Sequence, residues 1–197
     1  MSKTAIVLLA SGLSSRFEKG DKLMAPLADA PVLARAAALG AHAARRFAVV
    51  GVDQTDRRDL LTAAGWTLVD NPDPAAGMGA ALALGAAAVA ATHAGGLLVA
   101  LADMPLITDR HLAALTARAE DGAAAVFSKG GDAFGPPAFF ARSTFDALSR
   151  LEGDQGARGL RDRLGATATV AVQPDDMIDV DSVDDLARAT AVLDKRR

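Results

Sequence analysis

Short apolar runs alternate with helical segments along almost the whole chain, and this alternation constrains the fold more than any other feature. Two of the runs, 47–52 and 97–101, are continuously apolar, which is typical of strands covered on both faces. Alternating strands and helices predict an open, mainly parallel sheet with helices on both faces. The 197 residues contain no internal repeat or linker, so we expect one domain over residues 1–197.

The apolar runs predict the strands, and the segments between them predict the helices. Strands are expected at 4–9, 47–52, 66–69, 97–101, 123–127, 138–140 and 167–172. Helices are expected at 31–45, 55–64, 77–91, 108–120, 143–151, 154–164 and from 182 onward. The Pro- and Gly-rich segment 130–137 is expected to be a loop that leaves the sheet.

Charge and composition exclude several classes of protein. A formal net charge of -3, from 21 basic and 24 acidic residues, argues against a nucleic-acid or anionic-membrane partner. The absence of cysteine excludes disulfides, thiolate metal sites and cysteine nucleophiles, and it fits a reducing cytoplasm. Segment 74–102 has no charged residue, but its Ala and Gly content predicts a helix, a turn and a strand rather than a membrane span. We expect a cytoplasmic protein with no membrane partner.

A loop of small residues follows the first predicted strand, where Leu8–Lys22 reads LLASGLSSRFEKGDK. Small residues let backbone N–H groups approach an anion, and Arg16 and Lys22 supply positive charge. We expect Gly12 to provide the positive φ that a tight loop requires. The spacing matches neither a Walker loop nor a dinucleotide fingerprint. A polyphosphate site is predicted here, and a solvated turn with surface cations is the alternative.

Carboxylates are predicted at the same edge of the sheet, because ligands collect beyond the carboxyl ends of parallel strands. Asp103 comes just after the apolar run 97–101. Asp179 and Asp181 alternate with apolar residues, which predicts two carboxylates on one face of a short strand. Such like charges repel unless a cation or water lies between them. Oxygen ligands suit Mg²⁺, whereas a turn cap before Pro105 is the alternative role for Asp103.

The first loop resembles the Leu-Ala-Ala-Gly-x-Ser-x-Arg-Met-Gly-x-x-Lys signature of nucleotidyltransferases that join a nucleoside triphosphate to a phosphorylated acceptor. Ser11 replaces the second Ala, Phe17 replaces the Met, and one extra residue precedes Lys22. An apolar residue follows Lys22 as in the family, which favours it as the signature lysine, with Lys19 as the alternative.

Later motifs resemble the molybdenum cofactor branch of that family. Residues 102–105 resemble the Gly-Asp-Met-Pro metal motif of the whole family, with Ala102 in place of Gly. Residues 179–186 resemble its Asp-Ile-Asp-Thr-Pro-Glu-Asp-Leu segment, with Val183 in place of Pro. Residues 71–82 resemble the segment in which a helix N-terminus faces the nucleotide; a helix start whose glycines ease packing is the alternative. The segments 135–140 and 153–160 resemble those of the molybdenum cofactor cytidylyltransferase (MocA-like) group.

The resemblance implies a three-layer α/β/α Rossmann-like nucleotidyltransferase (GT-A-like) fold with a mainly parallel mixed sheet. It implies Mg²⁺-dependent transfer of CMP from CTP to a molybdopterin-type acceptor, with a molybdoenzyme or its chaperone as a further partner. The site residues that it implies are Arg16 and Lys22 for catalysis; Leu9, Ala10, Ser11, Gly12, Ser14, Asn71, Gly77, Met78 and Gly79 for the nucleotide; Asp154, Gly156 and Arg158 for the acceptor; and Asp103, Asp179 and Asp181 for the metal.

Two alternatives to this activity remain. One is guanylyl or cytidylyl transfer to another acceptor, such as molybdopterin with GTP, or methylerythritol phosphate. The other is a non-catalytic maturation factor that binds the molybdenum cofactor. A pure carrier needs no metal carboxylates, so Asp103 and Asp179 favour an enzyme.

Overall fold

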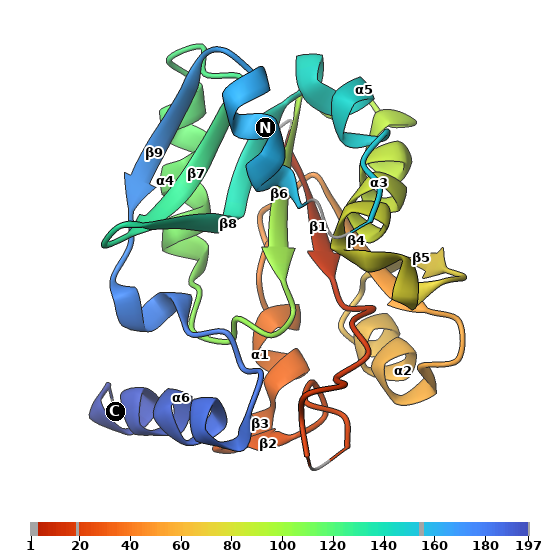
Figure 1. The fold of residues 1–197 in the computed structure, drawn as a ribbon, viewed down its shortest axis with the longest axis vertical. Helices are drawn as coiled ribbons and strands as arrows, with labels where there is room; N and C mark the ends of the chain where they lie inside the picture. The colour runs from red at the N-terminus through yellow and green to blue at the C-terminus, as the bar shows by residue number, and fades with distance from the viewer. Residues whose placement is uncertain (1–3, 19, 154–155, 197) are drawn as a thin grey trace.

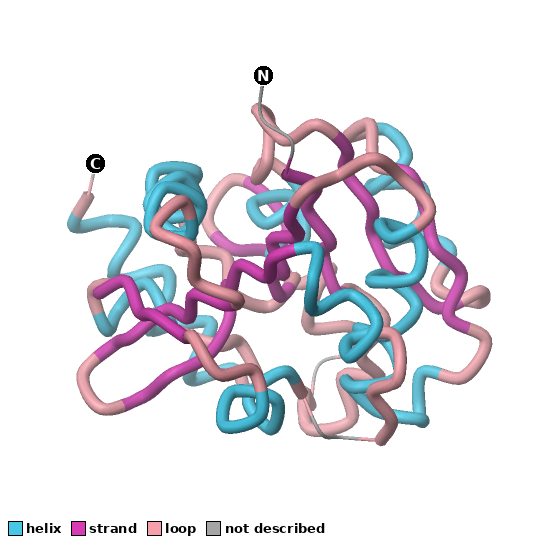
Figure 2. Tube along the Cα trace, turned by 90° about the horizontal axis from the view of Figure 1, so that it is seen from above, coloured by secondary structure: helices cyan, strands magenta, loops and turns pink. Residues whose placement is uncertain are grey.

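A seven-stranded mixed sheet forms the centre of the molecule, with strand order β5-β4-β1-β6-β8-β7-β9 (Figure 1). The structure is a computed structural model that describes residues 4–18, 20–153 and 156–196. Helices flank the strands when the sheet is seen from above (Figure 2). The predicted class, a mainly parallel α/β sheet with helices on both faces, is confirmed.

The strands follow the predicted apolar runs, although β8 begins at Ala133 instead of the predicted 138. They are β1 (Thr4–Leu9), β4 (Arg45–Gly51), β5 (Thr67–Asn71), β6 (Gly96–Leu101), β7 (Ala125–Gly130), β8 (Ala133–Ala141) and β9 (Thr167–Ala171), with a small separate pair, β2 (Pro26–Leu27) and β3 (Ala30–Pro31). Strand β8 runs antiparallel to β6 and β7, whereas the other pairings in the large sheet are parallel. Strands β1 and β6 are buried along their whole length, which explains their apolar sequences.

The helices connect these strands. The α-helices are α1 (Val32–Ala37), α2 (Thr55–Ala63), α3 (Gly77–Ala90), α4 (Asp109–Ala119), α5 (Phe145–Leu148) and α6 (Val183–Lys195), and the 3-10 helices are η1 (Pro74–Ala76), η2 (Arg142–Thr144), η3 (Ala157–Arg163) and η4 (Pro174–Met177). Segment 74–102 forms η1, α3, a turn and β6, as predicted. Among the described residues, no helix is long and apolar enough to cross a membrane.

The predicted helix 31–45 is wrong beyond Ala37, where α1 ends. The Trp66 indole N–H donates to the Ala37 carbonyl over 3.0 Å, and the Arg46 guanidinium donates to the same oxygen. These contacts come from β4 and from the residue before β5, so they satisfy the helix end from outside the local sequence. Gly40, with φ 73°, then turns the chain toward β4.

Three predictions in the second half of the chain also need correction. Segment 130–137 is not an excursion but the turn and first half of the β7–β8 hairpin, where Gly131 adopts φ 59°. Its prolines are tolerated because the β7–β8 register shifts nearby, between Phe127 and Ser128. The predicted helix 143–151 is limited to η2 and α5, and the described part of 154–164 forms the 3-10 helix η3.

Candidate active site

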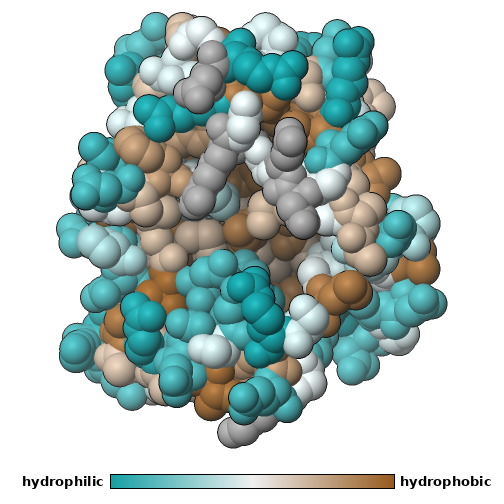
Figure 3. Space-filling model, viewed as in Figure 1, coloured by the Kyte–Doolittle hydropathy of each residue, from teal (hydrophilic) through white to brown (hydrophobic). Residues whose placement is uncertain are grey.

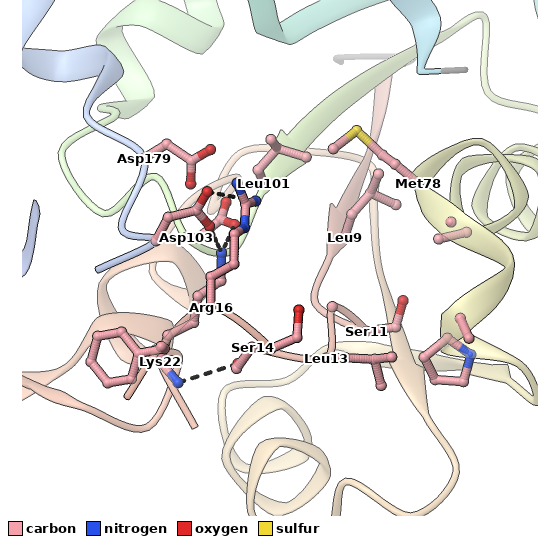
Figure 4. Close-up of a pocket in the computed structure, with 18 residues that line it drawn as sticks. Leu9, Ser11, Leu13, Ser14, Arg16, Lys22, Met78, Leu101, Asp103 and Asp179 are labelled. Carbon is pink, nitrogen blue, oxygen red and sulfur yellow. Dashed lines mark hydrogen bonds and ion pairs between the residues drawn. The ribbon is translucent and has the colours of Figure 1, made fainter. Parts of the chain in front are cut away.

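A cavity of about 410 Å³ opens at the carboxyl ends of β1 and β6, and we call it the polar cavity because Arg16, Lys22 and three aspartates line it (Figure 4). In the parallel β1–β6 register, Leu9 lies opposite Leu101, so the segments that follow these two residues leave the sheet at the same edge. The first loop, the N-terminal turn of α3 and the segment before α6 complete the walls. In Figure 3 this face is hollowed near its middle, with hydrophilic residues below the hollow.

Lys22 lies between two carboxylates in this cavity, those of Asp103 and Asp181. Its Nζ donates to Asp103 Oδ2 over 2.6 Å and to Asp181 Oδ1 over 2.7 Å. Only 8% of Lys22 is exposed. Burial favours the neutral amine, but the Asp103 charge and the hydrogen bonds to both carboxylates outweigh it and raise the pKa of Lys22. The lysine is therefore a fixed positive charge in the cavity floor.

Arg16 approaches the same cluster from the solvent side. Its guanidinium forms an ion pair of 2.7 Å with Asp181 Oδ2, although 79% of the arginine side chain is exposed. Asp181 thus contacts Lys22 with one oxygen and Arg16 with the other. An exposed arginine on a loop can turn toward a ligand at little cost, because a surface ion pair contributes about 0–1 kcal/mol.

Asp103, Asp179 and Asp181 offer oxygen atoms that all lie within 4.8 Å of one another. Among the described residues, Asp103 Oδ1 is buried without a hydrogen-bond partner. Partial burial and the Asp103 charge raise the pKa of Asp179 to about 7, against the lowering effect of Lys22. An unsatisfied buried oxygen beside crowded carboxylates fits a divalent cation, which takes oxygen ligands and relieves the repulsion.

The backbone around Asp179 and Asp181 differs from the prediction. Residues 179–181 do not form the predicted strand but lie in the connection between η4 and α6. Ile178 and Val180 are nevertheless buried, and Asp179 and Asp181 line the cavity, so the predicted alternation is present. The Val180 N–H donates to the Asp103 carbonyl over 2.9 Å and fixes the two acidic segments together. A capping box between Ser182 and Asp185 then starts α6.

The predicted backbone conformation of the first loop is also wrong. Gly12 lies outside the left-handed region, and Ser14 adopts φ 55° instead. A Cβ built on Gly12 has no neighbour within 4 Å. Steric demands within the protein therefore do not explain the glycine. Gly12 lines the cavity, so the absence of a side chain leaves its backbone open to a ligand.

The structure brings most of the predicted nucleotide residues to the cavity but not all of them. Those that line it are Leu9, Ser11, Gly12, Ser14, Gly77 and Met78. Ala10, Asn71 and Gly79 are described but are not among the lining residues. Asn71 instead donates to Ser11 Oγ over 2.9 Å, and the Gly79 N–H donates to the Gly153 carbonyl over 2.7 Å. These two residues support the walls from behind.

A second cavity of about 540 Å³ adjoins the first and shares Leu9, Met78, Leu101 and Asp179 with it. Its other lining residues are mostly apolar, namely Leu82, Val99, Met104, Phe127, Gly135, Pro136, Ala138, Phe140, Gly156, Gly159 and Met177. The predicted acceptor residue Gly156 therefore lies here. Asp154 is outside the described residues, and Arg158 is described only as part of the η3 backbone.

One buried residue beside the site was not identified from the sequence. Arg57 on α2 is 3% exposed and hydrogen-bonds the first loop at several points. In the sequence it belongs to the charged run 56–59, which is typical of a solvated helix face. Its position 36 residues from Asp21, the loop residue with which it pairs, gives no local signal.

The carboxyl edge of this mainly parallel α/β sheet carries a small-residue loop, two cationic side chains and three carboxylates, an arrangement suited to a nucleotidyltransferase. The chain belongs to the MobA-like NTP transferase domain family, whose model matches residues 6–172. It is 33% identical over 121 residues to the purine catabolism protein PucB of Bacillus subtilis (strain 168). That alignment covers 60% of this chain and 57% of PucB, so it spans little more than half of the relative.

Solved structures share the fold over nearly the whole chain. A homologue of Mycobacterium tuberculosis rv0371c from Mycobacterium sp. strain JC1 is 24% identical, with a TM-score of 0.80 and coverage of 99% and 98% of the two chains. Rv0371c of Mycobacterium tuberculosis H37Rv, in complex with manganese, is 23% identical, with a TM-score of 0.74 and coverage of 96% of this chain and 98% of Rv0371c. Molybdopterin-guanine dinucleotide biosynthesis protein A of Archaeoglobus fulgidus is 20% identical, with a TM-score of 0.74 and coverage of 97% of this chain and 99% of that protein. At these identities the similarity concerns the fold.

Proposed function

We propose that this nucleotidyltransferase transfers CMP from CTP to the phosphate of a molybdopterin-type cofactor and releases pyrophosphate. The observation that supports the proposal is the pair of adjoining cavities that share Asp179. The polar cavity suits a triphosphate, because it combines a small-residue loop with Arg16 and Lys22. The apolar cavity suits the body of an acceptor whose phosphate reaches the carboxylate cluster.

In the proposed reaction, an oxygen of the acceptor phosphate attacks the α-phosphorus of CTP. The new O–P bond forms as the bond from the α-phosphorus to the pyrophosphate oxygen breaks, and pyrophosphate leaves. Arg16 and Lys22 neutralise charge on the phosphates, while the first loop orients them. The acceptor phosphate is already ionised near neutral pH, so no side chain has to act as nucleophile or strong general base.

Asp103, Asp179 and Asp181 would hold Mg²⁺ in this proposal. The unpartnered Asp103 Oδ1 and the close spacing of the three carboxylates support the assignment. When bound, the ion would neutralise negative charge on the reacting phosphates of CTP. The manganese complex of Rv0371c shows a divalent metal in a protein of this fold.

The acceptor assignment depends on the second cavity and on the family. Met78 and Met177 can pack against the flat face of a heterocycle, above a floor that includes the buried Phe127 and Phe140. Gly156 leaves room beside Met78. We propose the molybdopterin-type cofactor as this acceptor and a molybdoenzyme or its chaperone as the recipient of the product. The structural similarity to molybdopterin-guanine dinucleotide biosynthesis protein A makes guanylyl transfer from GTP the second candidate.

The test is pyrophosphate release by purified protein with Mg²⁺ and molybdopterin cofactor, compared between CTP, GTP, ATP and UTP. We expect release with CTP at a rate at least about tenfold above that with each of the other three triphosphates. Preference for GTP would favour the second candidate instead. No release with any triphosphate would contradict the proposed acceptor.

A further inference from the structure

Arg57 donates all five of its guanidinium N–H groups to the first loop. Nε and Nη2 form a bidentate pair with Asp21, at 2.7 Å to Oδ2 and 2.6 Å to Oδ1. Nη1 donates to the carbonyls of Ala10 and Gly12 over 2.7 and 2.8 Å. The remaining Nη2 hydrogen reaches Ser14 Oγ at 3.1 Å. Because Arg57 is 3% exposed, solvent offers little competition for these bonds.

These bonds determine where the loop amides point. In a trans peptide, the carbonyl of one residue and the N–H of the next point in opposite directions. Since the carbonyls of Ala10 and Gly12 face Arg57, the N–H groups of Ser11 and Leu13 face away from it. Ser11 and Leu13 both line the polar cavity, and in Figure 1 α2 lies beside the loop that follows β1.

Gln54, just before α2, adds a third contact of the same kind. Its Nε2 donates to the Ser11 carbonyl over 3.1 Å, while its Oε1 accepts from the Gly51 N–H over 2.8 Å. Three consecutive carbonyls, those of residues 10, 11 and 12, therefore accept from side chains of Gln54 and Arg57. This common orientation turns the following amides away from α2 and gives the loop a row of donors for an anion.

The same network extends to Lys22. Ser14 Oγ, which accepts from Arg57, also accepts from the Lys22 backbone N–H at 3.3 Å and donates to Asp21 Oδ1 at 3.3 Å. Asp21 immediately precedes Lys22. Arg57 thus holds both ends of the loop, from Ala10 to Asp21, and indirectly the lysine of the carboxylate cluster.

We infer that Arg57 is a positioning residue that aims the amides of the first loop at the triphosphate. Arg57 is not among the described residues that line the polar cavity, so it acts through the loop and not by touching the nucleotide. The inference rests on the proposed function, because it assumes that the loop binds a triphosphate.

Two variants, Arg57→Lys and Asp21→Asn, distinguish the positioning of the loop from the effect of the Arg57 charge and from a loss of folding. Lysine keeps the positive charge but cannot make a planar, five-donor set of contacts. Asparagine at position 21 keeps the size of the side chain and weakens the bidentate pair with Arg57. This second variant tests the inference if Arg57→Lys does not fold. Arg58→Gln is the matched control, because Arg58 is the neighbouring residue on α2 and pairs with the exposed Asp70.

The experiment is calorimetric titration of each protein with CTP in the presence of Mg²⁺. We expect Arg57→Lys to raise the Kd about 10- to 100-fold at unchanged stoichiometry, Asp21→Asn to raise it by a smaller factor, and Arg58→Gln to stay within about twofold. A merely structural role would lower the stoichiometry, since part of the protein is unfolded, and leave the Kd unchanged; that result would overturn the inference. Wild-type protein that binds no CTP, GTP, ATP or UTP would overturn the proposed function and the inference together.

Discussion

Lys22 Nζ and Asp103 Oδ2 lie 2.6 Å apart although 81 residues separate them in the chain. The contact joins the loop after β1 to the segment after β6, and these two strands are neighbours in the sheet. Because Lys22 also contacts Asp181, a single lysine links three separate parts of the chain. The two ion pairs of Lys22 therefore form together only when the sheet and the segment before α6 are both in place.

We predict that Lys22→Ala weakens triphosphate handling more than Lys19→Ala. Loss of Lys22 removes a charge that faces the phosphates, leaves Asp103 without its cation and leaves Asp181 with Arg16 alone. Loss of one such contact costs about 3 kcal/mol in the barrier, or about a hundredfold in kcat/KM for the triphosphate. Steady-state kinetics on both variants measure this difference. Equal losses would mean that the signature lysine is misassigned, and thermal unfolding of both proteins controls for misfolding. Lys19 lies outside the described residues.

Gly12→Ala should weaken triphosphate binding without destabilising the protein. A Cβ at this position meets nothing within 4 Å, and Gly12 is outside the left-handed region. The unfolding free energy should therefore stay the same or rise by about 0.4–1 kcal/mol. In contrast, the methyl group would occupy space that a phosphate needs, so the Kd for CTP should rise about tenfold. Denaturant unfolding and calorimetry test the two statements separately. Unchanged binding would show that the triphosphate does not approach Gly12.

Gly159→Leu should act on the acceptor alone. Gly159 lines the apolar cavity, and a Cβ there also has no neighbour within 4 Å. The added side chain should reduce the cavity and raise the KM for molybdopterin cofactor about tenfold, with the KM for CTP unchanged. Gly12→Ala provides the reciprocal control, because its effect should fall on CTP. If Gly159→Leu raises the KM for CTP instead, the two cavities have been assigned in the wrong order.

Acid should destabilise the fold through His111. The ring Nε2 lies 2.7 Å from Ser128 Oγ, and the single Ser128 hydroxyl hydrogen is donated to the Pro137 carbonyl. Nε2 must therefore carry the hydrogen in the neutral ring. Burial lowers the pKa of His111 below its usual 6.5, although Asp176 opposes the shift. Because the unfolded chain takes up the proton first, stability falls as the pH drops through about 6.5.

The measurement compares wild type with His111→Gln, which keeps a donor toward Ser128. As the pH falls from about 7.5 to about 5.5, wild type should lose unfolding free energy relative to the variant, by at most about 1.4 kcal/mol per pH unit. All other titrating groups are common to both proteins, so the difference isolates His111. Parallel stability curves would contradict the prediction.

The features that could be predicted from the sequence are those set by local pattern. The apolar runs of β1 and β6 identify the strands, and the position of Asp103 just after one of them identifies the acidic edge. Helix α1 is shorter than its sequence predicts because its last carbonyl accepts hydrogen bonds from Trp66 and Arg46, which only tertiary packing brings there. Arg57 was missed for the same reason, since its partners lie 36 to 47 residues away.

The most direct test of the proposed activity is pyrophosphate release from CTP with Mg²⁺ and molybdopterin cofactor, measured on wild type and Asp103→Asn. Asparagine keeps an acceptor for Lys22 but removes the carboxylate whose Oδ1 is free to bind a metal. Asp121→Asn is the control, because Asp121 is an exposed residue just after α4 that pairs with Arg118 in the last turn of that helix and does not line the polar cavity. We expect release by wild type and by the control, with a rate about 100- to 1,000-fold lower for Asp103→Asn at a similar melting temperature. Undiminished release by a folded Asp103→Asn protein would contradict the assignment of Asp103 to the metal site.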